Sequence, residues 1–314
     1  MPSLAVLLVP LFGSIAIGAF VRVLRLFDAE DARRFSRFVF LVAMPIAAFD
    51  FVRRSDPPTD IILGLGAAYG IALAITAGAA FVASRSLLGL TVREAGAAVF
   101  ACTCGNAIFL GIPIAIAVPD WTAPFFVLVM LEGTFCFAIG TALMTWPEGE
   151  GATGQLVENV LAALGRAFRN PIIIGTLLGL FASIVDLPMP ESFAQLFGFM
   201  ARVVGPVGLF VLGLSIVDIV ARGEVGGVKA PLILVPMKLV LFPVATGALT
   251  WAFTGDPGAT GAAILFTGLP PAVASIVLSN VYGQWQSGVA SLVGIGTVLG
   301  LITLVIFLVV GMPA

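Results

Sequence analysis

The sequence predicts an all-α polytopic membrane protein with ten transmembrane helices, arranged as two inverted five-helix repeats. Three observations point to this fold class. Charged residues are scarce, ten long apolar stretches follow one another along the chain, and arginine and lysine gather on alternate connections between them. Together these features require a surface that faces lipid over most of its area.

Charged residues are too few to cover a water-soluble protein of this length. Of 314 residues, 60% are hydrophobic and 10% are charged, whereas soluble domains contain about 25% charged residues. The formal net charge of −2 gives no sign of the basic face that nucleic-acid binding needs. The chain has no histidine, and its three cysteines lie within apolar stretches. We therefore expect no zinc site, no histidine-based catalytic triad and no cofactor.

Ten apolar stretches approach the ~20 residues that a membrane-spanning helix needs. No lysine or arginine precedes the first stretch, which therefore indicates a span and not a signal peptide. The sixth is the shortest, which favours a helix flanked by protein. The expected spans cover residues 4–26, 35–53, 60–84, 94–118, 123–146, 170–186, 194–220, 229–253, 259–281 and 287–311.

Arginine and lysine flank the odd-numbered connections between these spans. The even-numbered connections hold only Arg53 and Arg54. Because cytoplasmic connections are enriched in positive charge, the odd-numbered ones are expected in the cytoplasm and both termini on the other side of the cell (inner) membrane. The residues on odd-numbered connections are Arg22, Arg25, Arg33, Arg34, Arg37, Arg85, Arg93, Arg166, Arg169, Arg222 and Lys229.

Five spans in each half give the second half the opposite orientation to the first. We expect residues 1–147 and 170–314 to form the two inverted repeats, joined by a cytoplasmic linker at residues 148–169. Such repeats are typical of secondary transporters, whose substrate sites lie near the middle of the membrane where corresponding helices are interrupted.

Glycine and proline interrupt the fourth and ninth spans at matching places. The fourth span contains GNAIFLGIP from Gly105, and the ninth contains TGLPPAVAS from Thr267. Proline removes a helical hydrogen bond and clashes with the preceding turn. Backbone groups freed at membrane depth are tolerated only against protein or a wet cavity. A single proline often marks only a kink, but matched breaks favour a binding site. The second and seventh spans also match, at Met44-Pro45 and Gly205-Pro206.

At these residues the chain resembles the auxin efflux carrier family, which includes plant auxin carriers and bacterial permeases for malonate or malate. The resemblance implies that the broken fourth and ninth helices cross. It also implies a scaffold of spans 1, 2, 6 and 7, a transport unit of spans 3–5 and 8–10 that moves as an elevator, and a homodimer through the scaffold. The matching segments are GNAIFLGIP from Gly105, FRNPIIIGTLLGL from Phe168, PVGLFVLGLSI from Pro206, MKLVLFP from Met237 and LPPAVASIVLSNVYG from Leu269.

The resemblance also extends to individual residues. Asn106 matches the asparagine that contacts substrate in plant carriers, and Pro113 and Pro270 match the prolines that mark the crossings. Glu132 stands where plant carriers have a glutamine beside the substrate, and Lys238 stands where they carry a basic residue. Plant carriers have an acidic residue in the third span, where this chain has Tyr69. Neither auxin as substrate nor a coupling scheme therefore follows from the resemblance.

Glu132 and Lys238 are ionisable residues near the middle of predicted spans. A charge at the bilayer centre costs at least about 2.5–3.5 kcal/mol, so both are functional candidates. Glu132 is the candidate for proton coupling, and Lys238 offers a positive charge to an anion. The alternative for both is an ion pair that holds the fifth and eighth helices together. Sodium coupling is less supported, because oxygen side chains near the break are limited to Asn106, Thr103 and Glu132.

The remaining candidates lie at the two breaks. The amide of Asn106 both donates and accepts hydrogen bonds, so it suits a carboxylate or lost backbone bonds. Helix N-termini exposed at the breaks also suit an anion. Pro270 and Pro271 interrupt the ninth span, where Thr267 and Ser275 offer hydroxyl groups. The alternative for both hydroxyls is a hydrogen bond to the carbonyl one turn earlier. Outside the breaks, Arg202 is expected to cap the outer end of the seventh span.

The sequence thus predicts a secondary transporter of a small organic anion, by alternating access. The expected substrate is a mono- or dicarboxylate such as malonate or malate, or an auxin-like acid, and the other expected partner is the lipid bilayer. Two alternatives stay open. A substrate-gated channel or a transport-like sensor also fits paired helix breaks. An intramembrane enzyme is disfavoured by the lack of histidine and the few acidic residues within the spans.

Overall fold

The computed structural model describes residues 4–54, 59–146, 171–221 and 228–311, and these residues form helices without any β-strand. The linker expected at residues 148–169 lies outside the described residues. Each of the ten predicted apolar stretches contains helix. The elements are α1 (Leu4–Val23), α2 (Ala29–Phe38), η1 (Val39–Ala43), α3 (Met44–Arg54), α4 (Thr59–Ser86), α5 (Val92–Thr103), η2 (Ala107–Gly111), α6 (Ile112–Ala117), α7 (Pro119–Met144), α9 (Pro171–Ile184), α10 (Glu191–Ala221), α11 (Lys229–Pro236), η3 (Met237–Leu241), α12 (Phe242–Thr254), α13 (Pro257–Gly268), α14 (Ala274–Tyr282) and α15 (Gln286–Gly311).

Six continuous helices among the described residues are long and apolar enough to cross a membrane. They are Ala29–Arg54, Ile61–Ser86, Asp120–Met144, Glu191–Leu214, Lys229–Thr254 and Gln286–Val309. The other four expected spans correspond to α1, to α9, and to two helices that are interrupted, α5–α6 and α13–α14. The ten-span count and the side on which the termini lie remain predictions.

Side-chain caps set where several of these helices begin. The second expected span begins at Ala29 and not at residue 35, because Asp28 accepts hydrogen bonds from the amides of Glu30 and Asp31. These two bonds lower the pKa of Asp28 below its ordinary value. Thr91 and Asp256 cap the two interrupted helices, α5 and α13, in the same way. Capping satisfies amides that would otherwise lack a partner at a helix start.

Among the described residues, three spans contain a wide turn, with hydrogen bonds between residues five apart, just before a proline. These turns are η1, η2 and η3, and each ends two residues before a proline: Pro45, Pro113 or Pro243. In each case the amide of the residue before the proline bonds to the carbonyl five residues earlier. Proline supplies no amide and would collide with the carbonyl four residues earlier. A locally widened turn therefore lets each helix continue past its proline.

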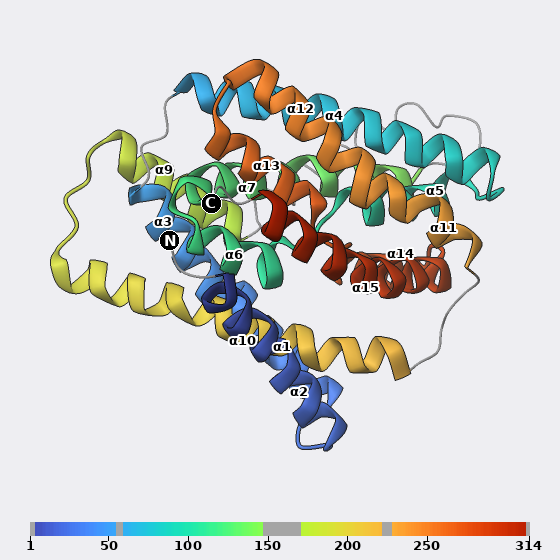
Figure 1. Cartoon of the computed structure of the whole chain (residues 1–314), viewed down its shortest axis with the longest axis horizontal. Coiled ribbons are helices and arrows are strands. Elements are labelled where there is room, and N and C mark those ends of the chain that lie inside the picture. Colours follow the sequence, from blue (N-terminus) through green and yellow to red (C-terminus); the bar gives the residue numbers. More distant parts are fainter. Residues whose placement is uncertain (1–3, 55–58, 147–170, 222–227, 312–314) are drawn as a thin grey trace.

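Two groups of helices make up the bundle. In the first, α1 packs along α10 and α3 packs along α9. In the second, α12 lies between α4 and α13, and α7 packs against α5 and α13. Figure 1 shows α4 and α12 side by side along one edge of the bundle and α10 along the opposite edge. The two groups meet where η2 and α6 touch α10, and also where α7 touches α3 and α9.

Glycines bring the helices of the first group close together. A Cβ atom added at Gly18 of α1 would collide with the carbonyl of Phe210 in α10. One added at Gly175 of α9 would collide with the carbonyl of Pro45 in α3. Small residues that allow backbones to approach are typical of helix contacts within membranes. The first group is therefore held by direct backbone contact.

These contacts predict that Gly18→Ala and Gly175→Ala each destabilise the protein by about 1–3 kcal/mol, because backbone atoms must move apart. Gly78→Ala is the matched control, since Gly78 lies in α4 with no atom near its Cβ position. That change is expected to stabilise by about 0.5–1 kcal/mol through helix propensity. The measurement is thermal unfolding in one detergent, and equal effects at all three positions would contradict the packing.

Candidate functional site

The fourth and ninth spans are interrupted where glycine and proline predicted the breaks. The first break separates α5 from η2, at residues 104–106, and the second separates α13 from α14, at residues 269–273. Residues Gly105 and Pro271 face each other as an isolated antiparallel bridge. The two breaks, far apart in the sequence, therefore lie directly against each other.

Two backbone hydrogen bonds join the breaks. The amide of Asn106 donates to the carbonyl of Pro270 at 2.8 Å, and the amide of Ala272 donates to the carbonyl of Cys104 at 3.0 Å. Interrupting a helix inside a membrane leaves amides and carbonyls that need partners. Each break satisfies polar groups of the other, so neither could unwind in this way alone.

Glu132 of α7 holds the first break. Its side chain is 6% exposed, and its Oε1 accepts a hydrogen bond of 2.7 Å from the amide of Gly105. A carboxylate that accepts from a backbone amide makes a charge-assisted bond, which is about twice as strong as a neutral one. Glu132 therefore binds the backbone of the first break. It lies within α7, the helix of the fifth expected span.

Lys238 of η3 holds the second break. Its side chain is fully buried, at 0% exposure, and its Nζ donates a hydrogen bond of 3.0 Å to the carbonyl of Thr267, near the end of α13. The carbonyl end of a helix favours a cation. The same Nζ lies 5.1 Å from the ring centroid of Phe242, a distance at which an aromatic face also attracts a cation.

Glu132 and Lys238 contact the backbone instead of each other. In the described part of the chain, ion pairs join Arg34 to Glu30 and Arg53 and Arg54 to Asp50, and none joins Glu132 to Lys238. The ion pair considered from the sequence as the alternative is therefore absent between these two residues. The acidic side chain comes from α7 and bonds to the first break, and the basic side chain comes from η3 and bonds beside the second.

Gly105 lets these groups converge. A Cβ atom at this position would lie 3.3 Å from Lys238 Nζ, from the carbonyl oxygen of Phe266 and from the Cβ of Leu269. These distances are tighter than almost all real Cβ contacts. Any larger residue would push apart the two breaks or displace the ammonium group.

Three other predicted polar residues have different surroundings. Asn106 is 4% exposed and begins η2, but its side chain makes no capping bond to that helix. Thr267 Oγ1 donates to the carbonyl of Ala263 at 2.7 Å, as the alternative from the sequence describes. Ser275 Oγ is buried without a hydrogen-bond partner among the described residues. Asn106 and Ser275 therefore keep side-chain hydrogen-bonding capacity that the helices do not use.

The three prolines predicted as site residues lie at two places, Pro270 and Pro271 at the second break and Pro113 at a separate cavity. Pro270 packs against Gly300 and Pro271 against Gly296, both in α15, with hypothetical Cβ contacts of 2.7 and 2.8 Å. Two glycines spaced one turn apart in α15 thus receive the consecutive prolines. The sequence analysis did not single out Gly296 and Gly300. Their spacing of four residues places both on one face of α15, and this spacing is the signal that could have identified them. Pro113 lies at a separate cavity, described below.

Residues 4–308 match the protein family described as "Membrane transport protein". The chain belongs to this family, the auxin efflux carrier family. No curated protein matches the chain. Membership in a transporter family, together with several apolar helices of membrane-spanning length, identifies a multi-pass membrane transport protein.

In this auxin efflux carrier family member, Tyr69 fills the core beside the breaks. It is fully buried, with its ring 5.9 Å from that of Phe242 and 6.0 Å from that of Phe266. Its hydroxyl group lies 3.3 Å from Cys136 Sγ. The position in the third span where plant relatives carry an acid is therefore occupied here by a packed aromatic residue.

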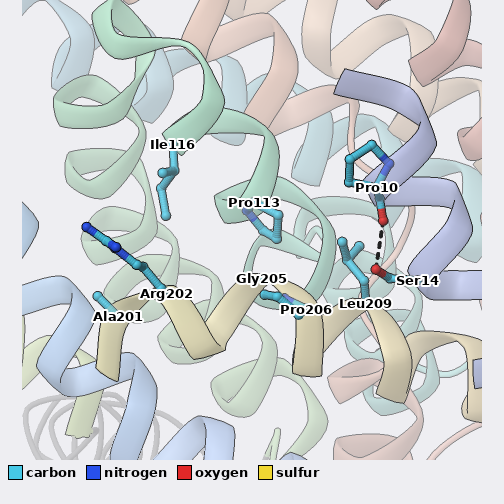
Figure 2. A pocket seen from close by; sticks show the side chains of 9 residues that line it. All are labelled: Pro10, Ser14, Pro113, Ile116, Ala201, Arg202, Gly205, Pro206 and Leu209. Carbon is cyan, nitrogen blue, oxygen red and sulfur yellow. Dashed lines mark hydrogen bonds between the residues drawn. The ribbon is translucent and has the colours of Figure 1, made fainter. Parts of the chain in front are cut away.

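A cavity of about 260 Å³ lies between α1, α6 and α10 of this carrier. Figure 2 shows residues of α10 along one side, Pro113 and Ile116 of α6 above them, and Pro10 and Ser14 of α1 at one end. Arg202 is among the α10 residues that line it. Arg202 lies about three turns into α10, is exposed and borders the cavity, and its expected role as a cap at the outer end of the span stays a prediction.

Proposed function

We propose that the protein is a secondary active transporter of a small organic anion that works by alternating access. The observation that carries this proposal is the pairing of the two breaks, with Glu132 bonded to one and Lys238 bonded to the other. Transporters bind substrates where interrupted helices meet inside the membrane. The chain's membership in a transporter family supports the same function.

The helix contacts support an inverted repeat. If spans one to five of residues 1–147 exchange with spans six to ten of residues 170–314, the α1–α10 contact becomes the α9–α3 contact. The α6–α7 contact likewise becomes the α14–α15 contact, and all four contacts are present. This exchange is the one that a pseudo-two-fold axis in the membrane plane requires.

The proposed division of labour follows the two groups of helices. Spans 1, 2, 6 and 7 (α1, α2–α3, α9 and α10) form the scaffold, and spans 3–5 and 8–10 form the transport unit. Backbone contacts at Gly18 and Gly175 lie inside the first group, which supports its role as the rigid part. The transport unit moves against it at the contacts of η2 and α6 with α10, as an elevator. A homodimer through the scaffold, a place in the cell (inner) membrane and termini outside the cytoplasm complete the proposal.

An anion is the substrate that the breaks suit best. Asn106 has a side-chain amide that its helix does not use, and Lys238 brings a positive charge to the breaks. The N-termini of η2 and α14 start within or beside the breaks, and helix N-termini attract anions. The proposed substrate class is a mono- or dicarboxylate, with malonate, malate and auxin-like acids as examples.

Proton coupling is proposed to act through Glu132. Its bond to the amide of Gly105 links the protonation of a buried carboxyl group to the geometry of the break. Protonation would remove the charge that strengthens this bond. Sodium coupling is less supported, since oxygen side chains near the first break are limited to Asn106, Thr103 and Glu132, and backbone carbonyls at the breaks would have to supply further ligands.

A channel or a transport-like sensor is the alternative, because paired breaks also suit a pore. Saturable flux and counterflow separate a carrier from a channel, and a sensor would bind without flux. Nothing in the geometry of the breaks favours an intramembrane enzyme.

Binding at the breaks predicts that Asn106→Ala removes carboxylate binding. A ligand that binds only the folded protein raises its apparent stability, so thermal shift across a panel of carboxylates is the measurement. An acid is expected to stabilise the unchanged protein and to lose most of that effect, about tenfold in affinity, in the variant, because a charged ligand loses one hydrogen bond. Thr267→Val is the control, since its hydroxyl is bonded within α13. If only neutral or cationic solutes stabilise the protein, the proposed substrate class is refuted, whereas the description of the fold is not affected.

A further inference from the structure

Residues 22–37 form the connection from α1 into α2, and this segment is rich in arginine. It holds five of the fifteen basic residues of the chain and three acidic ones, which leaves a net charge of +2. Figure 1 shows the turn between α1 and α2 at the end of the bundle, beyond α10. Basic segments beside a transmembrane helix attract the headgroups of anionic lipids.

The acidic side chains of this segment are already bonded within it. Asp28 accepts hydrogen bonds from the amides of Glu30 and Asp31, and Asp31 accepts one of 3.0 Å from the amide of Asp28. Glu30 pairs with Arg34 at 3.5 Å. These carboxylates therefore serve the first turn of α2, and they neutralise few of the arginines.

Three arginines of the segment keep guanidinium groups that a ligand can reach. Arg25 and Arg37 are exposed and have no hydrogen bond or ion pair to another described residue. The side chain of Arg34 is 72% exposed within its pair with Glu30, and such exposed pairs contribute little. A guanidinium group binds a phosphate group through two parallel hydrogen bonds.

Large apolar side chains stand beside these arginines and are also exposed. Leu24 and Leu26, on either side of Arg25, are 52% and 67% exposed, and Val23 at the end of α1 is 65% exposed. Leucine on both sides of an unpaired arginine suits the boundary of a bilayer, where apolar side chains enter the acyl region and arginine reaches the headgroups.

Aromatic contacts hold the segment in place against α10. The rings of Phe27 and Phe35 lie 5.5 and 6.1 Å from that of Phe210, and 5.9 Å from each other. Arg22 Nη1 donates to the carbonyl of Phe27 at 3.4 Å. The exposed arginines and leucines are thus carried on a fixed support, so binding a lipid orders little of the backbone.

We propose that residues 22–37 form a binding surface for anionic phospholipids. Arg25, Arg34 and Arg37 bind the phosphate groups of the headgroups, and Leu24 and Leu26 contact the acyl chains. The connection is one of those expected in the cytoplasm, and the cytoplasmic leaflet is the one that anionic lipids make negative. This inference concerns the contact between protein and membrane and does not depend on the transported substrate.

The test measures binding of phosphatidylglycerol and of phosphatidylcholine with the same acyl chains, by native mass spectrometry of the purified full chain. The unchanged protein is expected to bind phosphatidylglycerol at least tenfold more tightly. Arg25→Gln and Arg37→Gln are each expected to weaken phosphatidylglycerol by about fivefold and to leave phosphatidylcholine unchanged. Equal binding of the two lipids by the unchanged protein would overturn the proposal.

Arg85→Gln is the matched control for the charge. Arg85 is exposed at the end of α4, on another connection expected in the cytoplasm, and bonds to the carbonyl of Leu90. Its loss is expected to change phosphatidylglycerol binding by less than twofold. If Arg85→Gln weakens the lipid as much as Arg25→Gln does, the attraction is a general effect of positive charge and the proposed surface is refuted.

Two further measurements test the lipid itself. Leu26→Asn removes an exposed apolar group, so the variant should fold, and it is expected to weaken both lipids at least twofold. Soluble glycerol phosphate, which carries the charge without acyl chains, is expected to displace phosphatidylglycerol only at concentrations at least a hundredfold higher. Binding that Leu26→Asn leaves intact, or displacement by glycerol phosphate at equal concentration, would show a site for free phosphate compounds and contradict the proposal.

Discussion

Lys238→Met is expected to abolish transport while leaving the protein folded. Methionine nearly matches the length of the lysine stem and is compatible with a fully buried position. It removes the donor of the 3.0 Å bond to the carbonyl of Thr267 and the positive charge beside the breaks. A substrate anion would then lose its electrostatic partner at that place. We expect the transport rate to fall at least ~100-fold, the effect of losing about 2.7 kcal/mol of charge stabilisation.

Stability is expected to change much less than transport in this variant. The carbonyl of Thr267 loses a partner, at a cost of about 1–3 kcal/mol, but the cost of burying a charge also disappears. Uptake of labelled carboxylate into proteoliposomes and thermal unfolding measure the two effects. Lys229→Met is the control, because Lys229 begins α11 and is exposed. Transport by Lys238→Met within a few-fold of the unchanged protein would refute a role for this charge.

Glu132→Gln is expected to remove the pH dependence of transport. The glutamine carbonyl oxygen is able to accept the bond from the amide of Gly105, now at 2.7 Å to Oε1, so the first break should keep its shape. The group no longer exchanges a proton, however, and a proton-coupled cycle would stop. We expect transport driven by a proton gradient to fall at least ~100-fold, as for other proton-transfer groups.

Exchange of substrate in the absence of a gradient distinguishes coupling from binding. Glu132→Gln should retain exchange, because the break and its neighbours remain in place, while losing gradient-driven uptake and its variation with pH. Glu191→Gln is the control, at the exposed start of α10. An unchanged pH profile in Glu132→Gln would rule out Glu132 as the proton carrier.

The positions of the breaks were predictable from sequence because glycine and proline act locally. Gly105 and the Pro270-Pro271 pair weaken the helix at their own positions, and matching positions in two halves indicated that the breaks belong together. The pairing itself was not predictable, because the bond from Asn106 to Pro270 depends on the tertiary arrangement. The same limit left Glu132 and Lys238 undecided between a role in transport and an ion pair with each other, and their bonds to the backbone of the breaks were not expected.

The expected hydrogen bond from a hydroxyl group to the carbonyl one turn earlier is present at Thr267 and, within the described residues, absent at Ser275. Thr267 lies inside α13, so the carbonyl one turn earlier, that of Ala263, is available and is bonded. Ser275 lies in the first turn of α14, where the residue four positions earlier is Pro271, in the second break. The hydroxyl of Ser275 therefore has no helical carbonyl to bind. Helix boundaries, which sequence locates only within a few residues, decide between these outcomes.

Arg202 was not predicted to border a cavity, for a related reason. Sequence gives its distance from the ends of α10 but not the helices that face it, and the cavity arises only when α1 and α6 pack against α10. Its neighbours Gly205 and Pro206 carried a signal of a special position, which was assigned only to a helix break. In the structure α10 continues through this point.

Counterflow in proteoliposomes tests the central claim, a carboxylate carrier with its site at the paired breaks, most directly. Vesicles are loaded with unlabelled phenylacetate or malonate and diluted into a trace of the labelled acid. The proposed mechanism predicts a transient, saturable accumulation of label in the unchanged protein, and its loss in Asn106→Ala. Label that only equilibrates without overshoot and without saturation, or an overshoot that Asn106→Ala leaves intact, would contradict it.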